Sequence, residues 1–366
     1  MIVMIEVLVV ITVLSLLMAR RASRYIWTGA LAALLVGWSV LHTPPTWVLL
    51  ASWIIFLPIA MLLTLTPLRQ NLVMSPLLAL YRKIMPGMSD TEREALEAGT
   101  VWWEADLFSG RPDWHRMLSF PAPALSDEEQ AFINGPTETF CSMVNDWEIT
   151  EERHDLSPEA WDYLKQEGFF GMIIPKRYGG LEFSANAHSA IVMKVASRSI
   201  SAGVTVMVPN SLGPAKLLLT YGTEEQKNHY LPRLAKGEEI PCFALTGPDA
   251  GSDAASMPDT GVICRQTHDG KDDVLGIRLN WEKRYITLGP VATLLGLAFQ
   301  LHDPDHLISD EDDIGITLAL IPTNTPGVEI GKRHYPMSQA FMNGPNRGRD
   351  VFIPMDWVIG GQAYVG

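Results

Sequence analysis

The chain has 366 residues, of which 47% are hydrophobic and only 19% are charged. Because soluble chains carry about 25% charged residues, and disordered chains combine high charge with low hydrophobicity, this composition excludes a disordered protein. The 28 Lys and Arg against 41 Asp and Glu leave a net charge of −13, which argues against general nucleic-acid binding. Three cysteines are too few for a disulfide framework and fit a reducing compartment.

Residues 1–66 differ sharply from the rest, because their only charged side chains are Glu6, Arg20, Arg21 and Arg24. The segment contains three apolar stretches, Ile2–Met18, Ile26–Leu41 and Thr46–Leu65. A membrane span needs about 20 apolar residues and at least about 17, so the third stretch qualifies and the first two are marginal. The alternatives are a cleaved signal peptide for the first stretch and a buried helix pair for the other two. We predict a membrane anchor over residues 1–66.

The basic residues predict the orientation of this anchor. Arg20, Arg21 and Arg24 precede the last two apolar stretches, Arg69, Arg82 and Lys83 follow them, and the loop of residues 42–45 between them contains neither Lys nor Arg. By the positive-inside rule, residues 26–65 are predicted to form a hairpin with both ends in the cytoplasm. The acidic remainder would then be cytoplasmic.

The remainder is predicted to contain a connector at 67–125, a helical domain at 126–240 and a strand-rich domain at 241–366. The expected helices begin at capping signals, namely Ser126 with Glu129, Ser157 with Pro158, Ser184, and Thr223 with Gln226. The expected strands are Val262–Arg265, Val274–Leu279, Arg284–Thr287, Thr293–Leu301, Gly315–Ile321 and Val328–Ile330. Helices followed by strands indicate an α+β fold rather than alternating βαβ units.

Two features that resemble reactive sites have simpler interpretations. His302 and His306 flank an acidic segment, but Pro304 disfavours the helical geometry that would direct both rings at one metal ion. We therefore interpret the acidic segment of residues 303–313 as a solvated loop and predict no metal site. Cys242, a lone thiol beside a strand, is predicted to be a packed core residue rather than a nucleophile.

Residues 242–253 form an apolar strand that leads into a loop rich in Gly, Pro, Asp and Ser. Such a loop can present backbone N–H groups and hydroxyls to an anionic or ring-carbonyl ligand, although an ordinary hairpin explains it equally well. In a second motif, alternation puts Tyr285 and Thr287 on one face of a strand. An aromatic plane beside a hydroxyl is typical of a site for a planar conjugated cofactor.

Together these motifs resemble the acyl-CoA dehydrogenase flavoenzymes. The resemblance rests on A-L-T-x-P-x-A-G-S-D at 244–253, Y-G-T-E-E-Q-K at 221–227, K-R-Y-I-T at 283–287 and Y-G-G-L at 178–181. The hydrophobic N-terminus and the segment Trp102–Phe108 more narrowly resemble the long bacterial fatty-acyl-CoA dehydrogenase of β-oxidation. The narrower resemblance would place the chain at the bacterial inner membrane, with its soluble body facing the cytoplasm.

The resemblance implies an FAD enzyme that oxidises a fatty acyl-CoA to the trans-2-enoyl-CoA, the first step of β-oxidation, and passes electrons to an electron-transfer flavoprotein. It implies an antiparallel β-barrel or sandwich after the helical domain, and a homo-oligomer in the full-length form. The cofactor-binding residues carried over are Phe243, Ala244, Leu245, Thr246, Ser252, Tyr285, Ile286 and Thr287. Ser252 also matches a position that contacts the acyl-CoA substrate.

The sequence departs from the family in three ways. Gly247 stands where the family usually has Glu, and Tyr285 replaces the usual Trp. The sequence ends at Gly366, about where the family's C-terminal helical bundle would begin. Because the catalytic carboxylate lies in that bundle, we expect a fragment that is inactive alone, and we name no catalytic base. The alternative is a non-catalytic, membrane-attached flavin- or acyl-CoA-binding module.

Overall fold

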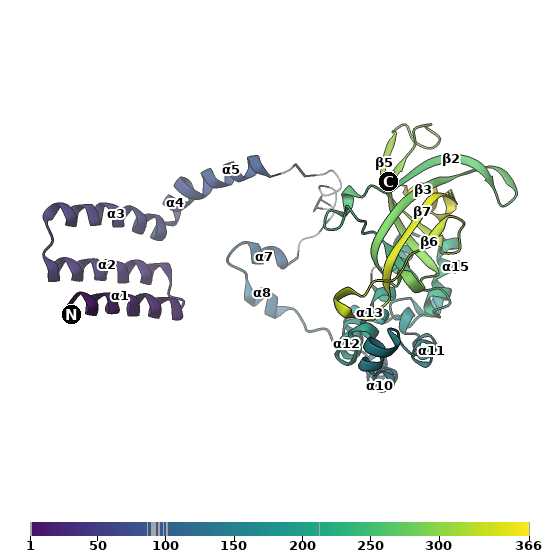
Figure 1. Ribbon diagram of the computed structural model, residues 1–366, viewed down its shortest axis with the longest axis horizontal. Helices are drawn as coiled ribbons and strands as arrows, with labels where there is room; N and C mark the ends of the chain where they lie inside the picture. Colours follow the sequence, from purple (N-terminus) through teal and green to yellow (C-terminus); the bar gives the residue numbers. More distant parts are fainter. Residues whose placement is uncertain are drawn as a thin grey trace. The chain divides into compact units, whose positions relative to one another are not determined.

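The computed structural model describes residues 2–85, 87–88, 93, 96–97, 99, 102–211 and 213–365. It divides into two compact units, residues 1–100 and 101–366 (Figure 1). Each unit has its own internal packing.

The first unit contains three apolar helices, α1 (Ile2–Ala19), α2 (Arg24–His42) and α3 (Thr46–Thr64). They coincide with the three predicted apolar stretches. Among the described residues, α2 and α3 are long and apolar enough to cross a membrane, whereas residues 8–19 of α1 form a shorter apolar helix. No residue of α2 and only Ala60 of α3 is buried, which differs from the buried helix pair considered as an alternative.

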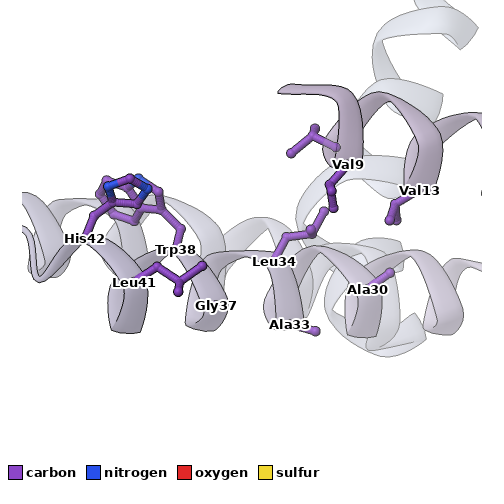
Figure 2. Close-up of a pocket in the computed structure, with 10 residues that line it drawn as sticks. Val9, Val13, Ala30, Ala33, Leu34, Gly37, Trp38, Leu41 and His42 are labelled. Carbon is purple, nitrogen blue, oxygen red and sulfur yellow. The ribbon is translucent and has the colours of Figure 1, made fainter. Parts of the chain in front are cut away.

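An apolar groove of about 660 Å³ lies between α1 and α2. In Figure 2, Val9 and Val13 of α1 lie across from Ala30 and Leu34 of α2, and Trp38 lies farther along α2. Such a lining favours contact with hydrocarbon over contact with water.

The helical path continues beyond α3. It passes through α4 (Thr66–Arg69) and a five-residue π-helix (Gln70–Met74) into α5 (Ser75–Ile84). In the second unit, two short helices come first, α7 (Glu104–Phe108) and α8 (Trp114–Ser119). The buried Trp103 ring packs 5.1 Å from Trp114 between centroids and donates its indole N–H to the Asp113 carbonyl at 2.8 Å.

The second unit then contains a helical layer. Its helices are α9 (Asp127–Asn134), α10 (Pro136–Met143), α11 (Pro158–Gln166), α12 (Ala185–Arg198), α13 (Ile200–Met207), α14 (Pro214–Tyr221) and α15 (Glu224–Ala235). The predicted capping boxes at Ser126–Glu129 and Thr223–Gln226 are confirmed, as are the caps at Ser157 and Ser184. These caps satisfy N–H groups that a helix leaves without internal partners.

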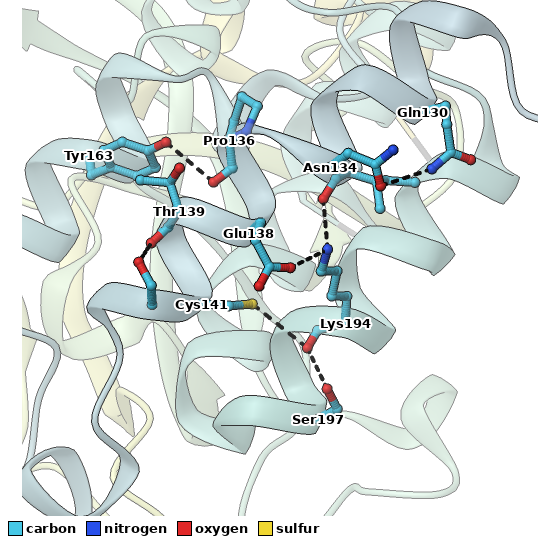
Figure 3. Close-up of polar contacts among 11 residues, drawn as sticks. Gln130, Asn134, Pro136, Glu138, Thr139, Cys141, Tyr163, Lys194 and Ser197 are labelled. Atoms are coloured by element: carbon cyan, nitrogen blue, oxygen red, sulfur yellow. Dashed lines mark hydrogen bonds and ion pairs between the residues drawn. The ribbon is translucent and has the colours of Figure 1, made fainter.

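Polar contacts join α9, α10 and α12 at the surface of this layer (Figure 3). The Lys194 ammonium contacts the Glu138 carboxylate at 2.6 Å and donates to the Ile133 carbonyl at 2.9 Å. Ile133 lies in the last turn of α9, where carbonyls lack partners within the helix. Lys194 therefore completes the end of α9 while pairing with α10.

Glu129 links the starts of two helices. Its two carboxylate oxygens accept the backbone N–H groups of Ser126, at 2.8 Å, and Ser184, at 2.7 Å. These backbone donors hold the pKa of Glu129 below its ordinary value, since they favour the ionised form. One buried side chain thus ties the N-caps of α9 and α12 together.

Glu129→Gln is expected to lower the free energy of unfolding by about 1–3 kcal/mol at pH 7, because one amide oxygen cannot serve both buried donors. The contribution of Glu129 is fully present above its unfolded pKa and is lost as the pH falls through its lower folded pKa. Urea denaturation at pH 7 and at acidic pH checks this. Glu128→Gln, at an exposed ion pair with Lys176, is the control. Equal losses in both variants would contradict the role of Glu129.

The strands form one seven-stranded curled sheet in the order β1-β4-β2-β3-β7-β6, with β5 paired to β4. Its strands are β1 (Pro241–Ala244), β2 (Thr260–His268), β3 (Lys271–Thr287), β4 (Leu294–His302), β5 (Asp313–Pro322), β6 (Val328–Ile330) and β7 (Asn343–Pro354). The α+β class is confirmed. The expectation of a fully antiparallel sheet is wrong for two strand pairs. Strands β1 and β2 each pair in parallel with β4, to which long connections lead.

The helical layer and the sheet share one hydrophobic core. Phe140, Leu164 and Ile191 from the helices belong to the same buried cluster as Ile277 and Phe299 from the sheet. Figure 1 shows the helices α10 to α13 gathered beside one end of the sheet. This shared core fixes the sheet edge that carries the candidate site.

Candidate functional site

The first candidate motif lies at the end of β1, the edge strand of the sheet. Ala244 is fully buried, whereas Phe243, Leu245 and Thr246 are partly exposed. A tight turn follows, in which Gly247 donates its N–H to the Ala250 carbonyl at 2.9 Å. Among the described residues, the Thr246 hydroxyl has no hydrogen-bond partner, so it is free to bind a ligand.

The second motif lies at a bulge in β3. The register of β3 against β7 shifts between Lys283 and Ile286, and Tyr285 adopts a left-handed backbone with φ of 58°. The Tyr285 side chain is 58% exposed, Ile286 is buried and Thr287 is partly exposed. Because Tyr285 lies within the bulge, regular strand alternation does not relate its side chain to that of Thr287.

A backbone hydrogen bond brings the two motifs together. The Arg284 N–H donates to the Thr246 carbonyl at 2.9 Å. A Cβ on Gly247 would lie 3.3 Å from the Glu282 carbonyl oxygen, which is a tight contact. The glycine that departs from the family pattern thus eases the close approach of the turn to β3.

Asn343, at the start of β7, forms hydrogen bonds with the second motif. Its amide nitrogen donates to the Tyr285 carbonyl at 3.0 Å and to the Thr287 hydroxyl oxygen at 3.2 Å. Because that oxygen already accepts, the Thr287 hydroxyl keeps its proton for another acceptor. The His334 ring lies 4.9 Å from the Tyr285 ring between centroids. Sequence reasoning missed both residues, since neither lies within either motif.

A buried ion pair anchors the loop between β1 and β2 to β3. The fully buried Lys283 ammonium contacts the Asp259 carboxylate at 2.5 Å and donates to the Leu245 carbonyl at 2.8 Å. The other Asp259 oxygen accepts the Glu282 N–H at 2.8 Å. Burial lowers the pKa of Lys283, and the Asp259 carboxylate opposes that change. Lys283 therefore fixes both ends of the loop that contains Thr246 and Ser252.

Ser252 is exposed and lies farther along the same loop. No hydrogen bond within the described part of the chain joins its side chain to Thr246 or Tyr285. The structure therefore brings together the residues around 243–246 and 285–287, and does not tie Ser252 to them.

The structure agrees with the interpretation of Cys242 and corrects that of the acidic segment 303–313. Cys242 is fully buried, and burial raises its pKa to about 12, as expected of a core thiol rather than a nucleophile. The interpretation of residues 303–313 as solvated is wrong for Asp303, which is fully buried and accepts three backbone N–H groups from 307–309. Within the described ranges, no group of three or more His, Cys, Asp or Glu side chains could hold a metal ion.

The site fits a planar conjugated ring with carbonyl acceptors, as the FAD implied by the resemblance would require. The free Thr246 hydroxyl and the Thr287 hydroxyl proton supply donors, and the exposed Tyr285 ring supplies an aromatic face. Ala244 and Ile286 have side chains that face the core, so their contribution to such a site is limited to the backbone.

Comparison with protein families gives two adjoining matches. The acyl-CoA dehydrogenase N-terminal domain matches residues 126–238, and the acyl-CoA dehydrogenase middle domain matches residues 242–345. The probable acyl-CoA dehydrogenase FadE10 of Mycobacterium tuberculosis is 32% identical over 258 residues, which cover 70% of this chain and 37% of that protein. A shorter match of 69 residues is 59% identical to Protein HemX of Proteus mirabilis, covering 19% of this chain and 41% of that one.

Solved structures give the same fold. A glutaryl-coenzyme A dehydrogenase in complex with glutaryl-CoA aligns with a TM-score of 0.54 and 26% identity, over 66% of this chain and 58% of that one. An acyl-CoA dehydrogenase from Bacillus anthracis complexed with FAD aligns with a TM-score of 0.53 and 22% identity, over 66% and 38%.

The chain spans about two fifths of the length of the curated relatives named above. Both matched family domains lie in the second unit, and together they contain the β1 loop, the β3 bulge and the start of β7. The chain therefore belongs to the acyl-CoA dehydrogenase family.

Proposed function

We propose that the face formed by residues 243–246 and 285–287 binds FAD in the oxidation of a fatty acyl-CoA to its enoyl-CoA. The observation that carries this proposal is the hydrogen bond from the Arg284 N–H to the Thr246 carbonyl, which joins the two motifs beside the free Thr246 hydroxyl and the Thr287 hydroxyl proton. When bound, FAD accepts the hydride that leaves the acyl chain. The FAD-bound and acyl-CoA-bound relatives support the cofactor and the class of substrate.

The residues of this face would bind and orient the cofactor. The Thr246 and Thr287 hydroxyls would donate hydrogen bonds to acceptors of its ring system. Tyr285 would cover part of the ring and exclude water, over a smaller area than a Trp would. Ser252, which is exposed, would contact the acyl-CoA. The carboxylate that removes the α-proton is not assigned to any described residue.

The proposal extends to the setting of the enzyme. The protein acts in fatty-acid β-oxidation as a homo-oligomer, passes electrons to an electron-transfer flavoprotein and is attached to the bacterial inner membrane through α2 and α3. The exposed apolar surfaces of these two helices support attachment, since such surfaces are costly in water. Sodium carbonate extraction tests it, and release of the protein from membranes would contradict a spanning hairpin.

Thr246→Ala is expected to weaken FAD binding about three- to tenfold, because it removes one hydrogen bond to the ligand. Thr246→Ser keeps the hydroxyl and should bind as the parent does. Titration of the purified protein with FAD, followed by flavin fluorescence, measures both variants. Equal binding by Thr246→Ala and the parent would contradict the assignment of Thr246.

The reaction itself is tested by adding acyl-CoA to the FAD-loaded protein and following the flavin absorbance near 450 nm. Because the sequence predicts a fragment that is inactive alone, FAD binding without bleaching is the expected result for this chain. Bleaching with formation of the enoyl-CoA would contradict that expectation, and a chain that does not bind FAD would contradict the proposed face.

A further inference from the structure

Helix α5 has two chemically different faces. Leu77, Leu80, Tyr81 and Ile84 recur at the i, i+3, i+4 and i+7 spacing that places side chains on one side of an α-helix. The opposite side contains Ser75, Ala79, Arg82 and Lys83, which are spaced by four, three and one residues. The helix is therefore amphipathic, with the exposed Leu78 at the border between the two faces, one turn before Arg82.

The apolar face of α5 is uncovered. Leu77, Leu80, Tyr81 and Ile84 are between 53% and 70% exposed, and no residue of α4, the π-helix or α5 is buried. An amphipathic helix of a globular protein turns such a stripe toward a core. The described part of the first unit provides no core for this one.

The position and charge of α5 favour one kind of partner. Only Leu65, which is extended, and the short α4 and π-helix separate α5 from α3, so α5 begins close to one end of the proposed membrane hairpin. Its charged side chains are both basic, Arg82 and Lys83, and they lie opposite the apolar stripe. Basic residues on the polar face and Leu, Ile and Tyr on the other are typical of helices that lie in a membrane interface.

We propose that α5 lies along the membrane surface, with Leu77, Leu80, Tyr81 and Ile84 in the acyl-chain boundary and Arg82 and Lys83 at anionic lipid headgroups. This inference rests on the proposed membrane attachment and adds a second contact to it. Each basic side chain strengthens attachment to an anionic surface about fivefold. The contact also opposes the repulsion between that surface and the acidic body.

The test uses the full chain, reconstituted in vesicles of phosphatidylcholine with phosphatidylglycerol and in vesicles of phosphatidylcholine alone. Spin labels are attached at Leu80→Cys on the apolar face or at Ala79→Cys on the polar face, with Cys141 and Cys264 replaced by Ser. Cys242 is fully buried and stays unlabelled. Electron paramagnetic resonance then compares label collisions with oxygen, which concentrates in lipid, and with a water-soluble nickel chelate.

The Leu80→Cys label should collide more with oxygen, and the Ala79→Cys label more with the nickel chelate. The double substitution Arg82→Glu and Lys83→Glu should move the Leu80→Cys label toward water in phosphatidylglycerol vesicles. Labels that are both accessible to the chelate would overturn the proposal. Labels shielded from both reagents would also overturn it, because the helix would then pack against the body or a second copy.

Carbonate extraction of the same vesicles separates this inference from the proposed attachment. If the chain stays in the vesicles while both labels remain in water, the proposed anchor stands and the interfacial position of α5 is overturned. If the chain is released, both proposals are overturned. An unchanged Leu80→Cys label in the doubly substituted chain would overturn the role of the headgroups.

Discussion

Lys283→Met is expected to lower the free energy of unfolding by about 3–5 kcal/mol, because it leaves Asp259 buried without its partner. Both side chains of the pair are almost completely shielded from water. Removing the ammonium also leaves the Leu245 carbonyl without its donor, at the start of the loop that contains Thr246. Urea denaturation at pH 7, followed by circular dichroism, measures the loss.

The pH dependence gives this prediction a specific signature. In Lys283→Met the isolated Asp259 has a raised folded pKa, so the variant should regain stability as the pH falls and the carboxyl becomes protonated. Adding Asp259→Asn should recover part of the loss, since it removes the unpaired buried charge and keeps an oxygen that accepts the Glu282 N–H. Arg284→Met, at the next and exposed position, is the matched control. A loss no greater than that of the control would contradict the buried ion pair.

Gln226→Leu is expected to be comparably severe. The Gln226 amide nitrogen donates to the carbonyls of Asp356 and Val358 at 2.8 and 2.7 Å, and its oxygen accepts from the N–H groups of Thr223 and Gly360 at 3.1 and 3.0 Å. The leucine satisfies none of these four groups. Each buried group left without a partner costs about 1–3 kcal/mol, so the variant should lose at least about 2 kcal/mol.

Thermal and urea unfolding of the second unit measure this loss. Glu225→Leu is the matched control, because Glu225 is the preceding residue of α15 and is exposed. Surface substitutions of that kind usually change stability by less than about 0.5 kcal/mol. Equal unfolding midpoints for the two variants would show that the link from α15 to residues 356–360 contributes nothing.

The starts of helices could be predicted because a cap depends on neighbours within three residues. Ser126 with Glu129 and Thr223 with Gln226 show this, since each pair has the reciprocal bonds that its spacing predicts. The sequence does not show that Glu129 and Gln226 also bind segments 55 and about 130 residues away. The local part of each role was therefore predictable, and the distant part depends on the fold.

The continuity of β3 was missed for a related reason. The sequence predicts two separate strands, Val274–Leu279 and Arg284–Thr287, whereas the structure has one strand from Lys271 to Thr287. The intervening residues alternate regularly, but one inward position is occupied by Lys283. Lysines are usually exposed, so the sequence alone does not predict a buried lysine at this position. Its burial depends on the ion pair with Asp259, 24 residues earlier.

The two motifs of the candidate site could be predicted from the sequence, but their contact with each other could not. Residues 243–246 and 285–287 were chosen from local chemistry, and their contact depends on hydrogen bonds from Arg284 to the Thr246 carbonyl and from Lys283 to the Leu245 carbonyl. Asn343 supports the second motif from 58 residues away along the chain. Its position follows from the register of β7 on β3, which alternation within one strand cannot reveal.

The backbone of Tyr285 has a consequence for the balance between stability and function. A tyrosine with a φ of 58° is held in a conformation that costs about 1 kcal/mol or more for a residue with a Cβ. Glycine would relieve this strain but would remove the aromatic ring. The bulge therefore stores conformational energy at a position whose ring is largely exposed and packs against only the His334 ring among the described aromatic residues. Under the proposed function, the position would trade stability of the free chain for a surface already shaped for a ligand.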